Sequence, residues 1–195
     1  MSHSPKFLKP IVFLAVLSIA TLADTGQSKS QMPGSQSPKT ALRKIYDEDQ
    51  ENRDDDSRRL LRAKVRQLIA EDKAQTGEDY YYAAFVFQHG QKPEDYLYAH
   101  VLATTALGMG FAPAKWLSAA TLDRYLRSVK QSQIFGTQFG SLFDEGQLEP
   151  YNKDMLSDKM RELWCVAPYS KQLKIVDDMK SGKEFTSTRI CPIPD

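Results

Sequence analysis

Two short polar motifs interrupt a stretch of apolar, alanine-rich sequence and contain the side chains best suited to chemistry. The first is Gln88-His89, and the second is Gln133-Ile134-Phe135-Gly136-Thr137-Gln138. An imidazole such as that of His89 can serve as an acid, a base or a ligand near neutral pH. The same histidine would equally cap the last carbonyls of a helix that ends at this point.

The second motif would make a poor core segment and a poor surface strand, because polar residues and a glycine surround its aromatic ring. A turn with Gly136 at positive φ would let backbone amides, Thr137 and Gln138 converge on a ligand or on a neighbouring segment. The alternative is a loop whose amides satisfy the ends of nearby helices. The sequence leaves both alternatives open.

A carboxylate and a guanidinium follow each other at Asp123-Arg124, late in a predicted helix. Adjacent helical residues point about 100° apart, so these two side chains cannot pair face to face. Asp123 would instead reach Arg127 at i,i+4, or both charges would point into a polar cleft. His100, on a largely apolar helix, is expected to be a hydrogen-bonded core histidine.

An acidic stretch from Asp47 to Arg59 carries seven acids and three arginines. Asn52 stands where a calcium-binding loop needs a glycine, so no metal site is predicted here. We expect a solvated helix in which Asp49 pairs with Arg53 at i,i+4, with Gln50 beside them. A second helix should begin at the acids 54–56, which suit the positive end of its dipole.

The spacing of apolar residues predicts an all-α protein of six or seven helices. The first helix starts near Ala41, and the others are expected at 57–73, 80–89 (capped by Asp79), 93–107, 113–128, 154–164 and 169–179. The segment 80–89 is apolar nearly all round, as expected of a central helix. The helices 93–107 and 113–128 form an alanine-rich hairpin that resembles one tetratricopeptide or Sel1-like unit, without a second copy. In the last two helices the residues expected to be buried are Met155, Met160, Leu163, Trp164, Leu173, Val176 and Met179.

The N-terminus has the parts of an export signal: Lys6 and Lys9, an apolar run at 11–22, and small residues ending at Ala23. The run is shorter than the roughly 20 residues that cross a bilayer. We therefore expect a signal peptide at 1–23, a flexible linker at 24–40, a helical domain at 41–182 and a C-terminal tail at 183–195. The chain should be exported, periplasmic or secreted, with no transmembrane span after cleavage; an uncleaved anchor is the alternative.

Charge, cysteines and absent motifs narrow the function classes. The 195 residues carry a net charge of +1, which gives no reason to expect a nucleic-acid partner. Cys165 and Cys191 are the only cysteines. In an exported chain they are most simply one disulfide that ties down the tail, whereas two isolated cysteines are a poor metal site. No motif for a phosphate, dinucleotide or zinc cofactor is present, so no cofactor is predicted.

Four spaced motifs resemble those of a bacterial family of uncharacterised proteins, a domain of unknown function. Its members show D-Q-x-x-R, Q-H, D-R and Q-x-[YF]-G-T-Q, matched here by Asp49-Gln50-x-x-Arg53, Gln88-His89, Asp123-Arg124 and Gln133-x-Phe135-Gly136-Thr137-Gln138. The resemblance is densest from Asp79 to Pro168 and includes Arg161-Glu-Leu-Trp164. The Gly-Trp-Pro turn of many relatives is absent here. The resemblance implies site candidates rather than a reaction, since the family has no agreed activity.

Three functions are consistent with these motifs. The first is a binding or interaction domain in which Gln88, His89 and the 133–138 loop contact a peptide or another protein. The second is a small hydrolase or transferase, with His89 as general acid or base and Arg124 holding an anion beside Asp123. The third is a structural polar network with no ligand. An open pocket shared by His89, Asp123 and Arg124 would favour the enzyme, and mutual burial would favour the network.

Overall fold

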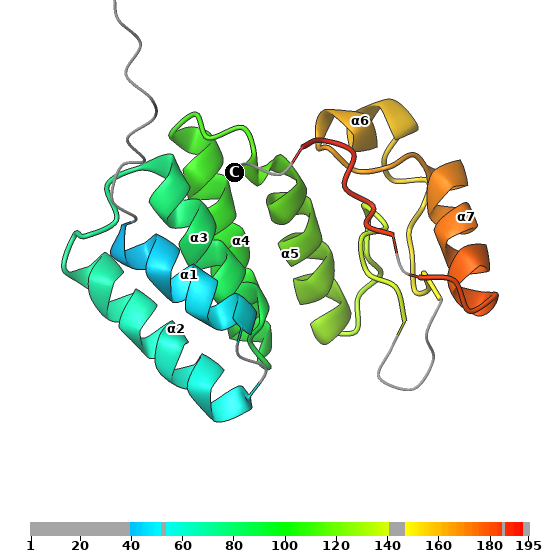
Figure 1. The fold of residues 1–195 in the computed structure, drawn as a ribbon. Coiled ribbons are helices and arrows are strands. Elements are labelled where there is room, and N and C mark those ends of the chain that lie inside the picture. Colours follow the sequence, from blue (N-terminus) through cyan, green and yellow to red (C-terminus); the bar gives the residue numbers. More distant parts are fainter. Residues whose placement is uncertain (1–39, 52–53, 141–146, 185, 193–195) are drawn as a thin grey trace, which may run out of the picture. The chain divides into compact units, whose positions relative to one another are not determined.

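The computed structural model describes residues 40–51, 54–140, 147–184 and 186–192. These ranges contain seven α-helices and no β-strand, which confirms the all-α prediction (Figure 1). The helices are α1 (Ala41–Glu51), α2 (Asp55–Ala70), α3 (Gly77–Gln88), α4 (Pro93–Gly108), α5 (Ala114–Ser128), α6 (Asp158–Leu163) and α7 (Tyr169–Lys180). None of the helices in these ranges has the length and apolar composition that a bilayer crossing requires. The predicted signal peptide at 1–23, nearly all of the linker at 24–40 and Arg53 lie outside the described residues.

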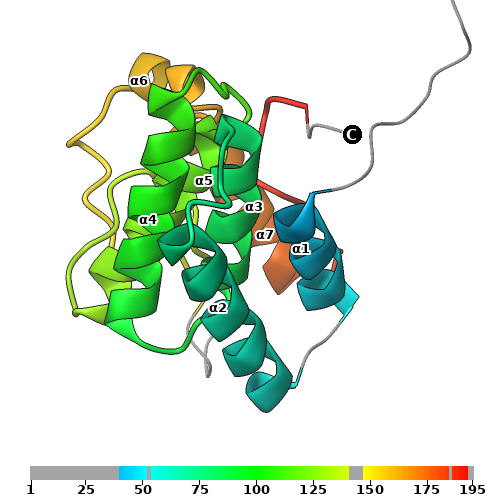
Figure 2. The same ribbon diagram turned by 90° about the vertical axis from the view of Figure 1, so that its left-hand side faces the viewer.

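Helix α3 is the central element of the helical unit. It packs against α1, α2, α4 and α5, and Figure 2 shows α1 and α2 on the side that faces the viewer. Its nearly continuous apolar surface is explained by these contacts on several sides, and it buries Tyr81, Tyr82, Ala83, Ala84, Val86 and Phe87. The sequence-based expectation of a central helix here is confirmed.

Small residues let α4 approach its neighbours closely. Ala99, Ala103 and Ala106 on α4 are fully buried, as is Ala114 on α5. His100 lies at the same interface, and its Nδ1 is 3.0 Å from the carbonyl oxygen of Ser118. Burial lowers the pKa of His100, while this hydrogen bond opposes the change. The predicted hydrogen bond of His100 is confirmed, but the residue is only partly buried rather than part of the core.

Local capping sets where α2 and α3 begin. The carboxylate of Asp54 accepts a hydrogen bond from the Ser57 amide, so α2 starts at the acidic cluster as predicted. Helix α3 starts earlier than predicted. Thr76 is its N-cap, and Asp79 is the third residue of a capping box with it, rather than the cap itself.

The predicted helix 154–164 is shorter than expected. Ser157 caps α6 by accepting from the Met160 amide, so the helix covers only Asp158–Leu163. Met155, Met160 and Leu163, predicted to be buried, are exposed, and so is Leu173 on α7. The inward position on α6 belongs instead to Arg161, whose guanidinium finds polar partners inside the protein. A buried hydrogen-bonded arginine overrides the apolar pattern in this segment.

A disulfide between Cys165 and Cys191 holds the C-terminal segment against the helices, as predicted. Val166 pairs with Arg189 in an isolated antiparallel bridge, and the indole Nε1 of Trp116 donates to the Thr188 hydroxyl at 3.1 Å. Thr188 is 1% exposed, so this segment forms part of the packed structure. The disulfide therefore joins α6 to a segment that also covers α5.

Removal of the disulfide should destabilise the protein strongly. The cysteines are 26 residues apart, and a loop of that size contributes about 3.5 kcal/mol in the chain-entropy model. We expect the double variant Cys165→Ala/Cys191→Ala to lose that amount in denaturant-induced unfolding. Reductant should destabilise the wild type equally and leave the double variant unchanged. A wild-type transition that is insensitive to reductant would contradict the pairing.

Candidate functional site

The Asp49-Gln50 and Gln88-His89 motifs meet through a buried carboxylate and a histidine. The Asp49 Oδ2 atom lies 2.6 Å from the His89 Nδ1 atom, and Asp49 is fully buried. The Nε atom of Arg58 lies 3.7 Å from the other oxygen of Asp49. The prediction of a solvated Asp49 was wrong. Asp49 lies one and two turns beyond Ile45 and Leu42 on the inward face of α1, and this face packs against α3.

The contact with Asp49 fixes how His89 presents its imidazole. A carboxylate can only accept, so the proton of this contact lies on Nδ1, and Nε2 is the ring nitrogen that keeps no partner. The side chain is 21% exposed, and no described residue forms a hydrogen bond with Nε2. The expected capping of helix carbonyls by the imidazole is not seen. Arginines bind these carbonyls instead: Arg124 contacts the Gln88 oxygen at 2.8 Å, and Arg62 the His89 oxygen at 3.4 Å.

Arg124 joins the Gln88-His89 motif to the 133–138 loop. Its NH1 donates to the Gln88 carbonyl, and its Nε donates to Oε1 of Gln138 at 3.2 Å. Within the described residues no carboxylate lies at ion-pair distance from this guanidinium. Burial lowers the pKa of Arg124, Tyr96 opposes this effect, and the positive charge of Arg127 adds to it. Arg124 is thus a desolvated charge held by neutral groups.

Asp123, in contrast, is enclosed by the 133–138 loop. Its carboxylate accepts from the backbone amides of Ile134 at 2.8 Å, Phe135 at 3.0 Å and Thr137 at 3.0 Å, and from the Thr137 hydroxyl at 2.8 Å. Burial raises the pKa of Asp123, and these four donors oppose the rise. The expected ion pair with Arg127 is not formed, because Arg127 donates to the Gly140 carbonyl at 2.6 Å.

The geometry of the loop depends on Gly136 and Gln133. Of the two alternatives that the sequence left open, the turn with Gly136 at positive φ is formed, with φ +80°, and a Cβ there would lie 2.2 Å from Oε1 of Gln172. The Gln133 carboxamide is fully buried. It donates to the carbonyls of Gln138 and Leu148 and accepts from the Gln138 amide at 3.0 Å. The loop therefore satisfies its own polar groups around the Asp123 carboxylate.

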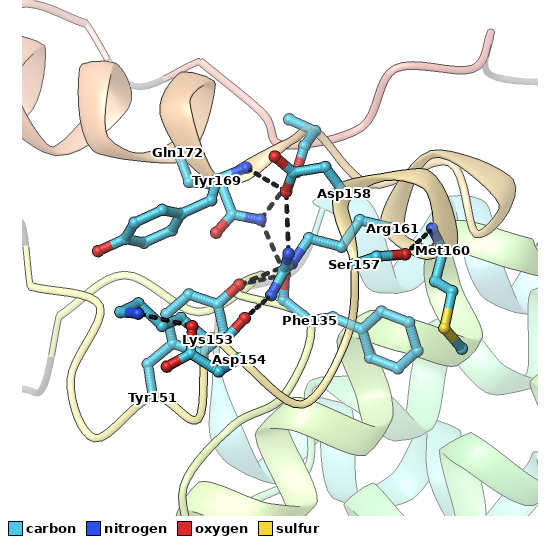
Figure 3. A network of polar contacts seen from close by, with 11 residues as sticks. Phe135, Tyr151, Lys153, Asp154, Ser157, Asp158, Met160, Arg161, Tyr169 and Gln172 are labelled. Atoms are coloured by element: carbon cyan, nitrogen blue, oxygen red, sulfur yellow. Dashed lines mark hydrogen bonds and ion pairs between the residues drawn. The ribbon is translucent and has the colours of Figure 1, made fainter.

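Behind the loop, a second polar network connects it to α6 and α7 (Figure 3). The Phe135 carbonyl accepts from the Tyr151 hydroxyl at 3.2 Å and from Nε2 of Gln172 at 2.8 Å. Arg161 donates from Nε to the Tyr151 hydroxyl at 2.9 Å and from NH1 to Asp158 at 2.9 Å. Burial raises the pKa of Tyr151 to about 12, so its hydroxyl remains a donor at neutral pH. This network supports the loop from the side opposite Asp123.

Sequence reasoning missed Tyr151, Arg161 and Gln172 as partners of the loop. The only signal was that Arg161 falls in the Arg161-Glu-Leu-Trp164 segment that carries part of the family resemblance. A buried arginine cannot be told from a surface arginine by spacing alone. Its partners Tyr151 and Lys153 precede it by ten and eight residues and lie outside its helix, so helical spacing does not reveal them.

The four predicted motifs form one continuous set of contacts with two parts. Asp123, Gln133, Phe135, Gly136 and Thr137 are buried and form a structural support. The second part, which we call the α3-end site, lies at the C-terminal end of α3 and consists of Gln88, His89, Arg124 and Gln138. Gln50 is exposed and donates to Asp49 at 3.2 Å. The single open pocket expected for an enzyme using His89, Asp123 and Arg124 is not formed, because Asp123 is buried within the loop.

Comparisons with protein-family models, with curated proteins and with solved structures each found no match for this chain. The resemblance to the bacterial family therefore stays a prediction. Within the described ranges, no group of three or more His, Cys, Asp and Glu side chains is arranged to hold a metal ion.

Replacement of Asp123 by asparagine should destabilise the fold. An asparagine oxygen could accept only part of the four hydrogen bonds, and its amide nitrogen would face other donors. We expect Asp123→Asn to reduce the free energy of unfolding by about 2–4 kcal/mol in denaturant titrations.

The matched control for this variant is Asp154→Asn. The Asp154 side chain is 82% exposed and forms only a surface ion pair with Lys153, so its replacement should change stability by less than about 0.5 kcal/mol. Equal effects of the two substitutions would contradict the assignment of Asp123 as the support of the loop.

Proposed function

We propose that the protein is an exported helical binding domain whose ligand occupies the α3-end site. One observation carries this proposal: three side chains that belong to the last residues of α3 or contact them keep hydrogen-bonding groups that no described residue satisfies. These groups are the Gln88 carboxamide, the Nε2 atom of His89 and the NH2 atom of Arg124. Export is supported by the disulfide and by the predicted signal peptide.

The Gln88 side chain shows how these groups differ from the satisfied polar groups of the 133–138 loop. Gln88 is 8% exposed, yet its carboxamide forms no hydrogen bond with a described residue. The Gln133 carboxamide, in contrast, is satisfied inside the protein. The amide atoms of Gln88 are not enclosed, because they are not among the buried side-chain atoms that lack a partner in the described residues, so they are available to a binding partner.

This difference predicts opposite results for two glutamine variants. Gln88→Met removes no hydrogen bond within the described protein, so the free energy of unfolding should change by less than about 0.5 kcal/mol or rise. Gln133→Met leaves several buried groups unpaired and should cost about 2–4 kcal/mol. Chemical unfolding of both variants beside the wild type gives the comparison. A large loss in Gln88→Met would assign Gln88 to the structural network instead.

The binding proposal can be tested by nuclear magnetic resonance on the full chain. Mixtures of small polar compounds and short peptides are added to labelled protein, and the amides of residues 88–90, 124 and 138 are followed. We expect a ligand that shifts these signals and binds at least about tenfold more weakly to Gln88→Met. Gln67→Met, at an exposed glutamine of α2, is the control and should bind normally. Binders that shift only signals elsewhere would contradict the proposal.

A second candidate function is supported by the contact between Asp49 and His89. A buried carboxylate at 2.6 Å from Nδ1 orients the ring and favours proton acceptance at Nε2, which is the arrangement of a general base. In that case the ligand of the α3-end site would be a substrate. Conversion of a bound compound over time, lost in His89→Gln, would establish the enzyme, and unchanged compound would leave a binding domain.

A further inference from the structure

We infer that the ligand of the α3-end site carries an oxyanion, a carboxylate or a phosphate, which pairs with Arg124. The inference rests on the proposed function and names the chemical class of its ligand. It follows from the charges around the end of α3 and from the free nitrogen of Arg124.

The carboxylates near the end of α3 already have partners. Asp49 contacts His89 and Arg58, and Asp95 lies 3.9 Å from Arg62 and 3.8 Å from Arg66. Asp123 is enclosed by the donors of the 133–138 loop. Arg124 has no carboxylate among the described residues, so positive charge is in excess where this side chain lies.

Capping of α3 does not by itself account for Arg124. A guanidinium at a helix C-terminus is stabilised by the free carbonyls and the helix dipole. Arg62 provides an internal comparison, because it also donates to a carbonyl at the end of α3, that of His89, but keeps Asp95 at ion-pair distance. A partly buried arginine without an anion is costly, which makes this position suited to an anionic group from outside.

The free donors of Arg124 have the geometry for an oxyanion. Its Nε and NH1 atoms are occupied by Gln138 and Gln88, and the NH2 atom has no partner among the described residues. Guanidinium nitrogens of this kind bind carboxylate and phosphate oxygens by charge-assisted hydrogen bonds. Because NH1 binds the carbonyl of the Gln88-His89 peptide, the guanidinium lies within about 6 Å of the His89 backbone.

His89 gives the readout for this ligand. Its Nδ1 contacts Asp49, and its Nε2 has no hydrogen-bond partner among the described residues. Nε2 accepts from a donor when the ring is neutral and donates to an oxygen when the ring is protonated, so the ring responds to a group bound beside Arg124 in either state. Gln88 directly precedes His89 in the sequence, and its carboxamide can both donate and accept.

The experiment uses the full wild-type chain and the ring proton signals of its histidines. Sulfate, phosphate and acetate are titrated at constant ionic strength against sodium chloride, and the shift of the His89 signal is recorded. We expect saturable shifts with the oxyanions and none with chloride. His100, which is bonded to the Ser118 carbonyl between α4 and α5, is the internal control and should move little. A His89 response that is linear and identical in chloride would overturn the inference.

Two arginine variants locate the anion. Arg124→Gln should weaken oxyanion binding at least about tenfold, since it removes the charge and the fork of donors. Arg127→Gln is the matched control, because Arg127 is another arginine of α5 and donates to the Gly140 carbonyl, outside the α3-end site. It should bind within about twofold of the wild type. Equal weakening by both variants would show a general charge effect and overturn the inference. If Arg124→Gln does not fold, Arg124→Lys, which keeps the charge and loses the fork, replaces it.

The outcomes also separate this inference from the proposed function. Neutral compounds with hydroxyl and amide groups, such as glycerol and glycinamide, are titrated beside the oxyanions. Saturable shifts at His89 with neutral compounds and not with oxyanions would refute the anionic class while the binding domain stands. Absence of any response from oxyanions, neutral compounds and peptides would refute both.

Discussion

The burial of one carboxylate, that of Asp123, determines the shape of the 133–138 loop and the contacts that depend on it. Three backbone amides and a hydroxyl of the 133–138 loop point at it, so the loop takes its shape from a charge on α5. Desolvation of a carboxylate is unfavourable unless donors replace water, and here the donors come from one short segment. The position of Gln138, and through it the setting of Arg124, depends on this arrangement.

The other side of the loop is also held by hydrogen bonds, and within the described residues one buried atom there, Oε1 of Gln172, has no partner. The carbonyl of Phe135 is bound by Tyr151 and Gln172, and Arg161 in turn fixes the Tyr151 hydroxyl. These contacts join the loop to α6 and α7. Polar networks of this kind specify a unique arrangement because any rearrangement leaves buried groups unpaired. The packing of Phe135 with Ala119 and Val166 in one apolar cluster adds to this support.

At the end of α3 some polar groups are left without partners. The Gln88 carboxamide, the outer nitrogen of His89 and one nitrogen of Arg124 form no hydrogen bond with a described residue, whereas the polar groups around Asp123 are satisfied. The Asp49 carboxylate holds the ring of His89 through its Nδ1 atom. Rigid support beneath incompletely satisfied groups is the usual construction of a binding site, in which the ligand supplies the remaining hydrogen bonds.

The sequence by itself determined the features that depend on neighbours along the chain. Apolar periodicity predicted the helices, Asp54 predicted the start of α2, the Gly136 turn was expected at positive φ, and the only two cysteines predicted their own pairing. Only the tertiary structure decided which polar residues are buried and what they contact. Asp49 meets His89 across 40 positions, and Asp123 meets a loop 11 to 14 positions away. Such partners are chosen by the packing of whole helices, whereas helix propensity and capping act within a few residues, so spacing alone could place the motifs but not join them.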